Sequence, residues 1–201
     1  PVVFANQVGA NDDLIFDGNS LAVGPDGSVR AALPAFEEAT ATVDPFDADP
    51  VGDLPNETAP DRAAEAREAI SLGIADYFRK TGFSEAIVGL SGGIDSSVAA
   101  ALAVDALGVE NVYGLSLPST VTSEESVADA RELAANLGIE FDVIPIGGPT
   151  EELERAIEEG AGTRIEGIAA ENTQARLRGD VLMAVANARD GLVLTPDNKS
   201  E

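Results

Sequence analysis

The sequence contains no cysteine among its 201 residues. Disulfide bonds and thiolate metal sites are therefore excluded within this chain, although the redox compartment does not follow from that absence. The chain also lacks a signal peptide and any run of about 18 apolar residues, the length that a membrane-spanning helix needs. These absences predict a soluble, cytoplasmic protein without a membrane partner.

Basic residues are scarce as well. The chain has 12 Lys and Arg residues against 36 Asp and Glu residues, for a formal net charge of -24. Nucleic acid is therefore excluded as a partner of the surface as a whole, because neutralising phosphates requires a basic patch. The near-neutral mean hydropathy predicts a folded protein with an acidic surface, as in salt-loving organisms. An anionic ligand would need a local source of positive potential.

The two ends of the sequence have the character of internal positions in a longer chain. Pro1 is not an initiator methionine, and Glu201 comes shortly after an apolar run typical of a buried strand. We therefore expect the sequence to be a fragment of a larger protein.

Composition predicts two domains joined by a linker. Residues 1–43 alternate short apolar runs with turns, including a hairpin signal at Asp26-Gly27, and predict the end of a β-rich domain. Residues 44–60 contain four prolines, five acidic residues and no basic residue, which predicts an inter-domain linker. Residues 61–201 then form the second domain.

The second domain alternates apolar runs with helical periodicity. We predict strands at 86–90, 112–117, 139–146 and 192–194, and helices at 61–80, 96–107, 122–137, 151–159 and 171–188, with Thr122 and Glu125 forming a capping box. This alternation predicts an α/β fold with a parallel sheet and right-handed crossovers. Ligands of such sheets bind outside the carboxyl ends of the strands.

The segment SGGIDSS, Ser91 to Ser97, follows the first of these strands and opens a helix. Its two glycines permit a tight turn, the helix start supplies unpaired amide groups, and three serines add hydroxyl donors. The turn has no lysine, so it is not the Gly-x-x-x-x-Gly-Lys-Ser/Thr loop, and it does not match Gly-x-Gly-x-x-Gly. It predicts an anion site of another kind.

Asp95 lies inside this turn and would repel a phosphate unless a cation came between them. Magnesium is held by one or two carboxylates together with substrate phosphates, so Asp95 is a candidate magnesium ligand. The alternative is an ordinary turn in which Asp95 caps the helix. The residues alone leave both interpretations open.

Ser-Gly-Gly-x-Asp-Ser-Ser after a strand resembles the signature of the ATP pyrophosphatase (PP-loop) enzymes. The resemblance implies an adenine nucleotide alpha hydrolase-like fold that splits ATP into AMP and pyrophosphate while adenylating a substrate. Three further stretches, Pro118 to Ile146, Glu171 to Asn187 and LVLTPDNKSE at the end, resemble NAD synthetases. Phe4 to Val23 resembles the closing strands of the nitrilase-like glutaminase domain of glutamine-dependent NAD synthetases.

The resemblance also implies roles for individual residues. Those matched to deamido-NAD contacts are Asn172, Arg176 and Glu201, and those matched to metal binding are Asp95 and Glu201. Those matched to ATP contacts are Gly89, Leu90, Ser91, Gly92, Gly93, Ile94, Asp95, Ser96 and Thr195. Asn172 and Arg176 share a helix face that Gly179 and Met183 continue. The alternative for Arg176 is a solvated residue paired with Asp180.

Two departures from the family pattern affect the expected activity. The second threonine of the family's Leu-Thr-Thr-Gly motif falls on Pro196 and the glycine on Asp197, so the ATP contact would pass to Thr195 or to a backbone carbonyl. The glutaminase cysteine, lysine and glutamates would lie upstream of Pro1. No glutaminase catalytic residue is therefore expected within this chain, which should have little activity alone.

The implied function is amidation of deamido-NAD to NAD through an adenylate, with ATP, Mg²⁺ and ammonia from glutamine, in an enzyme that forms a homo-oligomer. The alternatives are another PP-loop ligase and a non-catalytic adenine-nucleotide-binding α/β domain. Asp95 separates the last of these from the enzymes, because a pure binder has no need of magnesium at the scissile phosphates.

Overall fold

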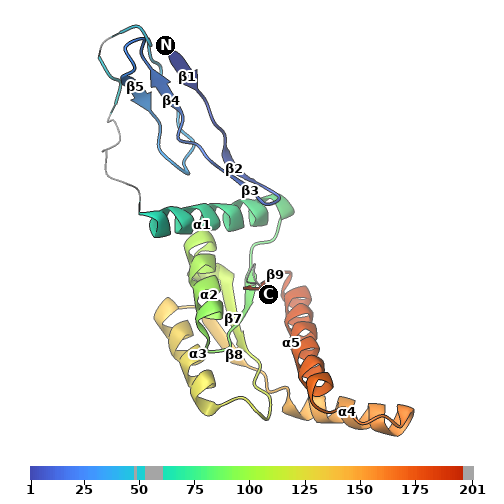
Figure 1. Ribbon diagram of the computed structural model, residues 1–201. Helices are drawn as coiled ribbons and strands as arrows, with labels where there is room; N and C mark the ends of the chain where they lie inside the picture. Colours follow the sequence, from blue (N-terminus) through green and yellow to red (C-terminus); the bar gives the residue numbers. More distant parts are fainter. Residues whose placement is uncertain (48, 53–60, 197–201) are drawn as a thin grey trace. The chain divides into compact units, whose positions relative to one another are not determined.

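The computed structural model describes residues 1–47, 49–52 and 61–196 (Figure 1). The chain divides into two compact units, Pro1–Thr81 and Gly82–Glu201, and each is described by itself. Within the described ranges, no helix is both long enough and apolar enough to cross a membrane.

The first unit is built from short antiparallel strands, as predicted for residues 1–43. A three-stranded sheet has the order β1-β4-β5, and a separate hairpin pairs β2 with β3. The bounds are β1 Val2–Phe4, β2 Val8–Asn11, β3 Leu14–Asp17, β4 Leu21–Val23 and β5 Val29–Ala32. The predicted Asp26-Gly27 turn joins β4 to β5 and is closed by a hydrogen bond from the amide of Gly24 to the carbonyl of Ser28, 2.8 Å long.

Helix α1 (Arg62–Thr81) is tied to the β2–β3 hairpin by Asp76, whose side chain is 5% exposed. Its carboxylate accepts a 2.8 Å hydrogen bond from the amide of Ala10 and pairs with Lys80 and Arg79. The hydrogen bonds from Lys80, from the Ala10 amide and from Arg79 hold the pKa of Asp76 well below its ordinary value. These contacts place α1 in the first unit, whereas the predicted domain 61–201 groups it with the parallel sheet.

The second unit is the predicted parallel α/β layer structure. Its four strands among the described residues are all parallel and have the order β8-β7-β6-β9. The strands are β6 Ala86–Gly89, β7 Val112–Ser116, β8 Glu140–Val143 and β9 Leu192–Leu194. The helices are α2 Ile94–Leu107, a 3-10 turn η1 Val109–Asn111, α3 Glu124–Leu137, α4 Gly147–Ala161 and α5 Ile168–Arg189. The fold class predicted from the sequence is confirmed.

The chain adds strands first on one side of β6 and then on the other side. From β6 it crosses through α2 to β7 and through α3 to β8, and then returns through α4 and α5 to β9 on the other side of β6. Since crossovers between parallel strands are right-handed, the two directions place α2 and α3 on one face and α5 on the opposite face (Figure 1). The carboxyl ends of β6 and β9 therefore form a topological switch point, where α/β sheets bind ligands.

The core explains why the central strands carry continuous apolar runs. Ala86, Ile87 and Val88 of β6 are fully buried because helices cover both faces, and Leu115 of β7 joins them. Ile87 and Leu115 pack with Ala186 of α5, so α5 is held against the strand that leads into the glycine turn.

The predicted capping box of α3 is wrong. Ser123 is the N-cap residue, and its hydroxyl accepts a 3.1 Å hydrogen bond from the amide of Ser126. Thr122 instead accepts a 3.0 Å hydrogen bond from the amide of Ser119 in the preceding loop. Because that hydroxyl is used to close the loop after β7, the helix begins one residue later than a Thr122 cap would allow.

The amino edge of the sheet is held by an arginine at the end of α5. The guanidinium of Arg189 lies 4.0 Å from the ring centre of Tyr113 and pairs with Glu85 at 2.7 Å and Glu140 at 2.8 Å. The phenol of Tyr113 donates a 2.6 Å hydrogen bond to Asp142. Burial, followed by that carboxylate, raises the pKa of Tyr113 to about 12. This cluster fixes the edge of the sheet opposite the glycine turn.

Candidate functional site

The turn Ser91–Ser97 leaves β6 at its carboxyl end and lies against the start of α3. Gly92 has a φ of 80°, in the region that favours glycine, and a Cβ at this position would lie 2.5 Å from the carbonyl oxygen of Ser126. Gly92 is therefore required both by its backbone angle and by the close approach of α3. These two requirements restrict the backbone conformation of the turn between β6 and α3.

Serine hydroxyls hold the turn from within. Ser96 is 4% exposed, and its hydroxyl donates to the carbonyl of Gly93 at 3.0 Å and accepts from the amide of Ser91 at 3.3 Å. The hydroxyl of Ser97 also donates to the carbonyl of Gly93, at 2.9 Å. The sequence predicted these hydroxyls as donors to an anion, but in the structure Ser96 and Ser97 use them to shape the turn.

Asp95 lies in the first turn of α2 with an exposed side chain. The N-cap residue of α2 is Gly93, in extended conformation, so the alternative in which Asp95 caps the helix is wrong. The first amide groups of a helix have no acceptor within the helix and carry the positive end of its dipole. Asp95 and these amides therefore lie together at the exposed start of α2, where Ile94 is also exposed.

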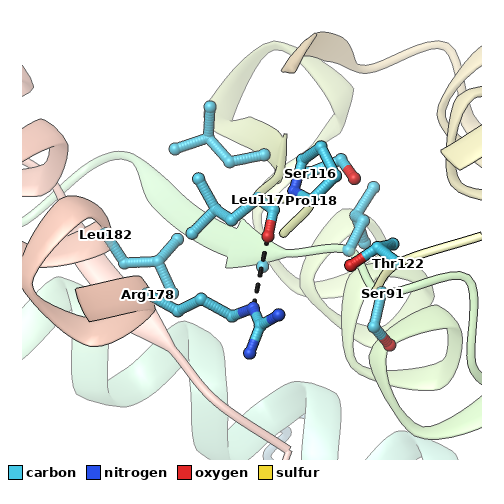
Figure 2. Close-up of a pocket in the computed structure, with 10 residues that line it drawn as sticks. Ser91, Ser116, Leu117, Pro118, Thr122, Arg178 and Leu182 are labelled. Carbon is cyan, nitrogen blue, oxygen red and sulfur yellow. Dashed lines mark hydrogen bonds between the residues drawn. The ribbon is translucent and has the colours of Figure 1, made fainter. Parts of the chain in front are cut away.

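A pocket of about 330 Å³ opens beside the turn, at the carboxyl ends of β6 and β7. Its lining residues are Gly89, Leu90, Ser91, Leu115, Ser116, Leu117, Pro118, Thr122, Arg178 and Leu182. Figure 2 shows Leu182 and Arg178 entering it from α5 on one side, with Ser91 and Thr122 on the other. The structure thus brings three predicted ATP-site residues, Gly89, Leu90 and Ser91, to one concave surface.

Arg178 is the charged residue of this pocket lining, and the sequence analysis did not predict it. It is half-buried, and its Nε donates to the carbonyl of Leu117 at 3.2 Å (Figure 2), while Nη2 donates to the hydroxyl of Ser119 at 3.3 Å. Helical spacing could have indicated that Arg178 lies near the core. It stands four residues before Leu182, which packs on the core, and residues at this spacing are neighbours on the helix surface. The sequence analysis assigned site residues of this helix to the face that carries Asn172 and Arg176, and Arg178 was not among them.

The other predicted site residues lie outside this pocket lining. Thr195 follows β9 and is exposed, at the same sheet edge as the turn because Val88 pairs with Leu194. Asn172 and Arg176 are both exposed, and within the part of the chain that the structure describes Arg176 forms no salt bridge with Asp180. The ion-pair alternative for Arg176 therefore receives no support.

Two further predictions fall wholly or partly outside the described residues. Glu201, matched to metal and substrate, lies outside them, as does Asp197, whereas Pro196 is described and exposed. Among the described residues, no group of three or more carboxylates could hold a metal ion. Asp95 offers one carboxylate, which fits the mode in which magnesium takes most of its ligands from phosphates and water.

The family model for NAD synthase matches residues 66–201. The chain belongs to the NAD synthase family. The match extends from within α1 to the end of the sequence, well beyond the SGGIDSS turn.

Similarity to whole NAD synthases covers the entire chain. The chain is 44% identical over 203 residues to the glutamine-dependent NAD(+) synthetase of Synechocystis. This alignment covers 100% of the chain and 36% of that protein. The structure of the glutamine-dependent NAD+ synthetase from Acinetobacter baumannii in complex with adenosine diphosphate aligns with a TM-score of 0.88 at 36% identity, covering 99% of this chain and 38% of that one. The chain thus spans little more than a third of these relatives.

Another related structure covers less of the chain. NMN synthetase from Francisella tularensis aligns with a TM-score of 0.62 at 32% identity, over 67% of this chain and 54% of that one. The relatives named as glutamine-dependent therefore also match the part of the chain that this alignment leaves uncovered.

Proposed function

We propose that the full-length protein containing this chain amidates deamido-NAD to NAD at the expense of ATP, which leaves as AMP and pyrophosphate. The observation that carries this proposal is the SGGIDSS turn at the switch point of a sheet, in a chain of the NAD synthase family. The ADP complex of a relative supports an adenine nucleotide as the ligand.

The reaction has two balanced steps. A carboxylate oxygen of the nicotinate group attacks the α-phosphorus of ATP, the bond to the β-phosphate oxygen breaks, and pyrophosphate leaves. Ammonia then attacks the acyl carbon of the adenylate, AMP leaves with the carboxylate oxygen, and a proton is released to solvent. The first step places growing negative charge on pyrophosphate, which preorganised donors stabilise by about 3–4 kcal/mol each.

The turn supplies those donors within this chain. The first amides of α2 have no acceptor within the helix, and the serine hydrogen bonds at Ser91, Gly93 and Ser96 hold the turn that leads into them. Magnesium would be held by Asp95, with Glu201 as the second proposed ligand, and would neutralise charge on the phosphates. Asn172, Arg176 and Thr195 remain proposed contacts of deamido-NAD and ATP.

Glutamine is the proposed source of ammonia because the glutamine-dependent relatives match the whole chain, its first 60 residues included. We propose that residues 1–43 close a glutaminase domain of the nitrilase type and that 44–60 is the linker. A cytoplasmic homo-oligomer is the expected form of the full-length enzyme.

The direct test supplies the purified full-length protein with ATP, deamido-NAD and ammonium, and measures NAD, AMP and pyrophosphate. The three products should form in equal amounts, and glutamine should replace ammonium. A parallel reaction with nicotinate mononucleotide tests the alternative product raised by the similarity to NMN synthetase. Preference for the mononucleotide, or formation of ADP in place of AMP, would overturn the proposal.

A further inference from the structure

Arg178 differs in its surroundings from the basic residues that pair with carboxylates. Acidic residues outnumber basic ones three to one, and the described salt bridges pair Arg30, Arg79, Lys80, Arg155, Arg164 and Arg189 with carboxylates. Arg178 is half-buried, yet in the described part of the chain it forms no salt bridge, and its two hydrogen bonds go to neutral oxygens. Within the described residues, no carboxylate therefore pairs with its positive charge.

The hydrogen bonds of Arg178 also orient it. Nε and Nη2 hold the guanidinium against the loop after β7, and Ser119, which accepts one of them, is itself tied to Thr122 through its amide at 3.0 Å. A guanidinium has five N–H donors in a planar fork. Two are used here, and within the described residues Nη1 has no hydrogen-bond partner, so donors remain for a ligand.

The pocket places this charge opposite the anion turn. Arg178 and Ser91 line the same cavity of about 330 Å³, from α5 and from the end of β6 (Figure 2). Leu90, Leu115 and Leu117 contribute apolar surface to the same lining, and apolar surroundings strengthen an ionic contact. In a chain of net charge -24, this arrangement gives the pocket a fixed source of positive potential.

We propose that Arg178 binds a phosphate of the adenine nucleotide directly, and specifically the phosphate that stays with the nucleoside. The turn and the start of α2 are left to the departing pyrophosphate, so the two ends of the scissile bond are held from opposite sides of the pocket. This inference rests on the proposed function in taking an adenine nucleotide as the ligand, and adds a substrate contact on α5.

The test measures equilibrium binding of adenosine, AMP and ATP to the full-length protein carrying Arg178→Met. Loss of a charged hydrogen-bonded contact should weaken AMP and ATP by about 10- to 100-fold and leave adenosine, which has no phosphate, unchanged. Arg178→Lys should recover part of the affinity, because it keeps the charge and loses the fork. Arg155→Met is the matched control, since it removes an exposed cation on α4 and should leave all three affinities as they are.

A purely structural role predicts a different pattern. If Arg178 only holds the loop after β7, the affinities for adenosine, AMP and ATP should fall by the same factor, and Ser119→Ala should reproduce part of that fall. Equal losses, or unchanged AMP binding in Arg178→Met, would overturn the inference. Such a result would leave the proposed function standing if the wild-type protein still forms NAD, whereas a wild type that binds no adenine nucleotide would overturn both.

Discussion

At the scale of the residue, the site depends on backbone geometry more than on reactive side chains. Gly92 allows the chain to turn where α3 approaches it closely, and the hydroxyl of Ser96 donates a hydrogen bond within the turn. The exposed Asp95 is the one carboxylate of the SGGIDSS segment. Residues that appear equivalent in the motif therefore differ in the structure, since some shape the turn and Asp95 is exposed at the start of α2.

Gly92→Ala should destabilise the second unit and abolish nucleotide binding. Holding a non-glycine residue at a φ of 80° costs about 1–3 kcal/mol, and the new Cβ would also meet the carbonyl of Ser126. Denaturant unfolding of the full-length protein measures this loss. The control is Gly160→Ala in α4, where a Cβ meets nothing within 4 Å and the free energy of unfolding should rise by about 0.5–1 kcal/mol. Equal stability of the two variants would contradict the account.

At the scale of the element, periodicity predicted most of the second unit. The apolar runs and helical spacings predicted strands and helices close to their observed bounds. The reason is that the apolar residues that define these patterns are the ones buried between the sheet and its helices. Arg178 was missed because its partner Leu117 lies 61 residues earlier, and no local pattern encodes that contact. The contact of α1 with the β2–β3 hairpin was likewise not predicted, since the apolar face of the helix does not specify which strands it packs on.

The tie between α1 and the β2–β3 hairpin is testable through pH. Asp76→Asn should lower the free energy of unfolding by about 1–3 kcal/mol at neutral pH, because charged hydrogen bonds to Ala10, Lys80 and Arg79 are lost. The folded-state pKa of Asp76 is lowered, so its contribution is full above the ordinary carboxyl value of 3.8 and is lost as pH falls below it. The difference between wild type and variant should therefore shrink on acidification.

The control for this measurement is Glu68→Gln, which removes an exposed carboxylate from the same helix. It should change stability little at any pH. If Asp76→Asn and Glu68→Gln gave the same small effect at neutral pH, the ion cluster would not hold α1 in the first unit.

At the scale of the whole molecule, the net charge of -24 sets the response to salt. Like charges repel across the surface, and molar salt shortens the screening length to about 3 Å. The unfolding temperature of the full-length protein should therefore rise as KCl is increased to molar concentration. A flat or falling dependence would contradict the halophile-like interpretation of the acidic surface.

The central claim is that the turn at the end of β6 splits ATP between its α and β phosphates to activate a carboxylate. The most direct measurement is exchange of labelled pyrophosphate into ATP by the full-length enzyme, with deamido-NAD present and both ammonium and glutamine omitted. Wild type and the control Asp129→Asn, an exposed carboxylate on α3, should exchange alike, while Asp95→Asn should lose at least about 100-fold yet keep its glutaminase activity. Exchange by Asp95→Asn at the wild-type rate, or wild-type exchange that does not require deamido-NAD, would contradict the account.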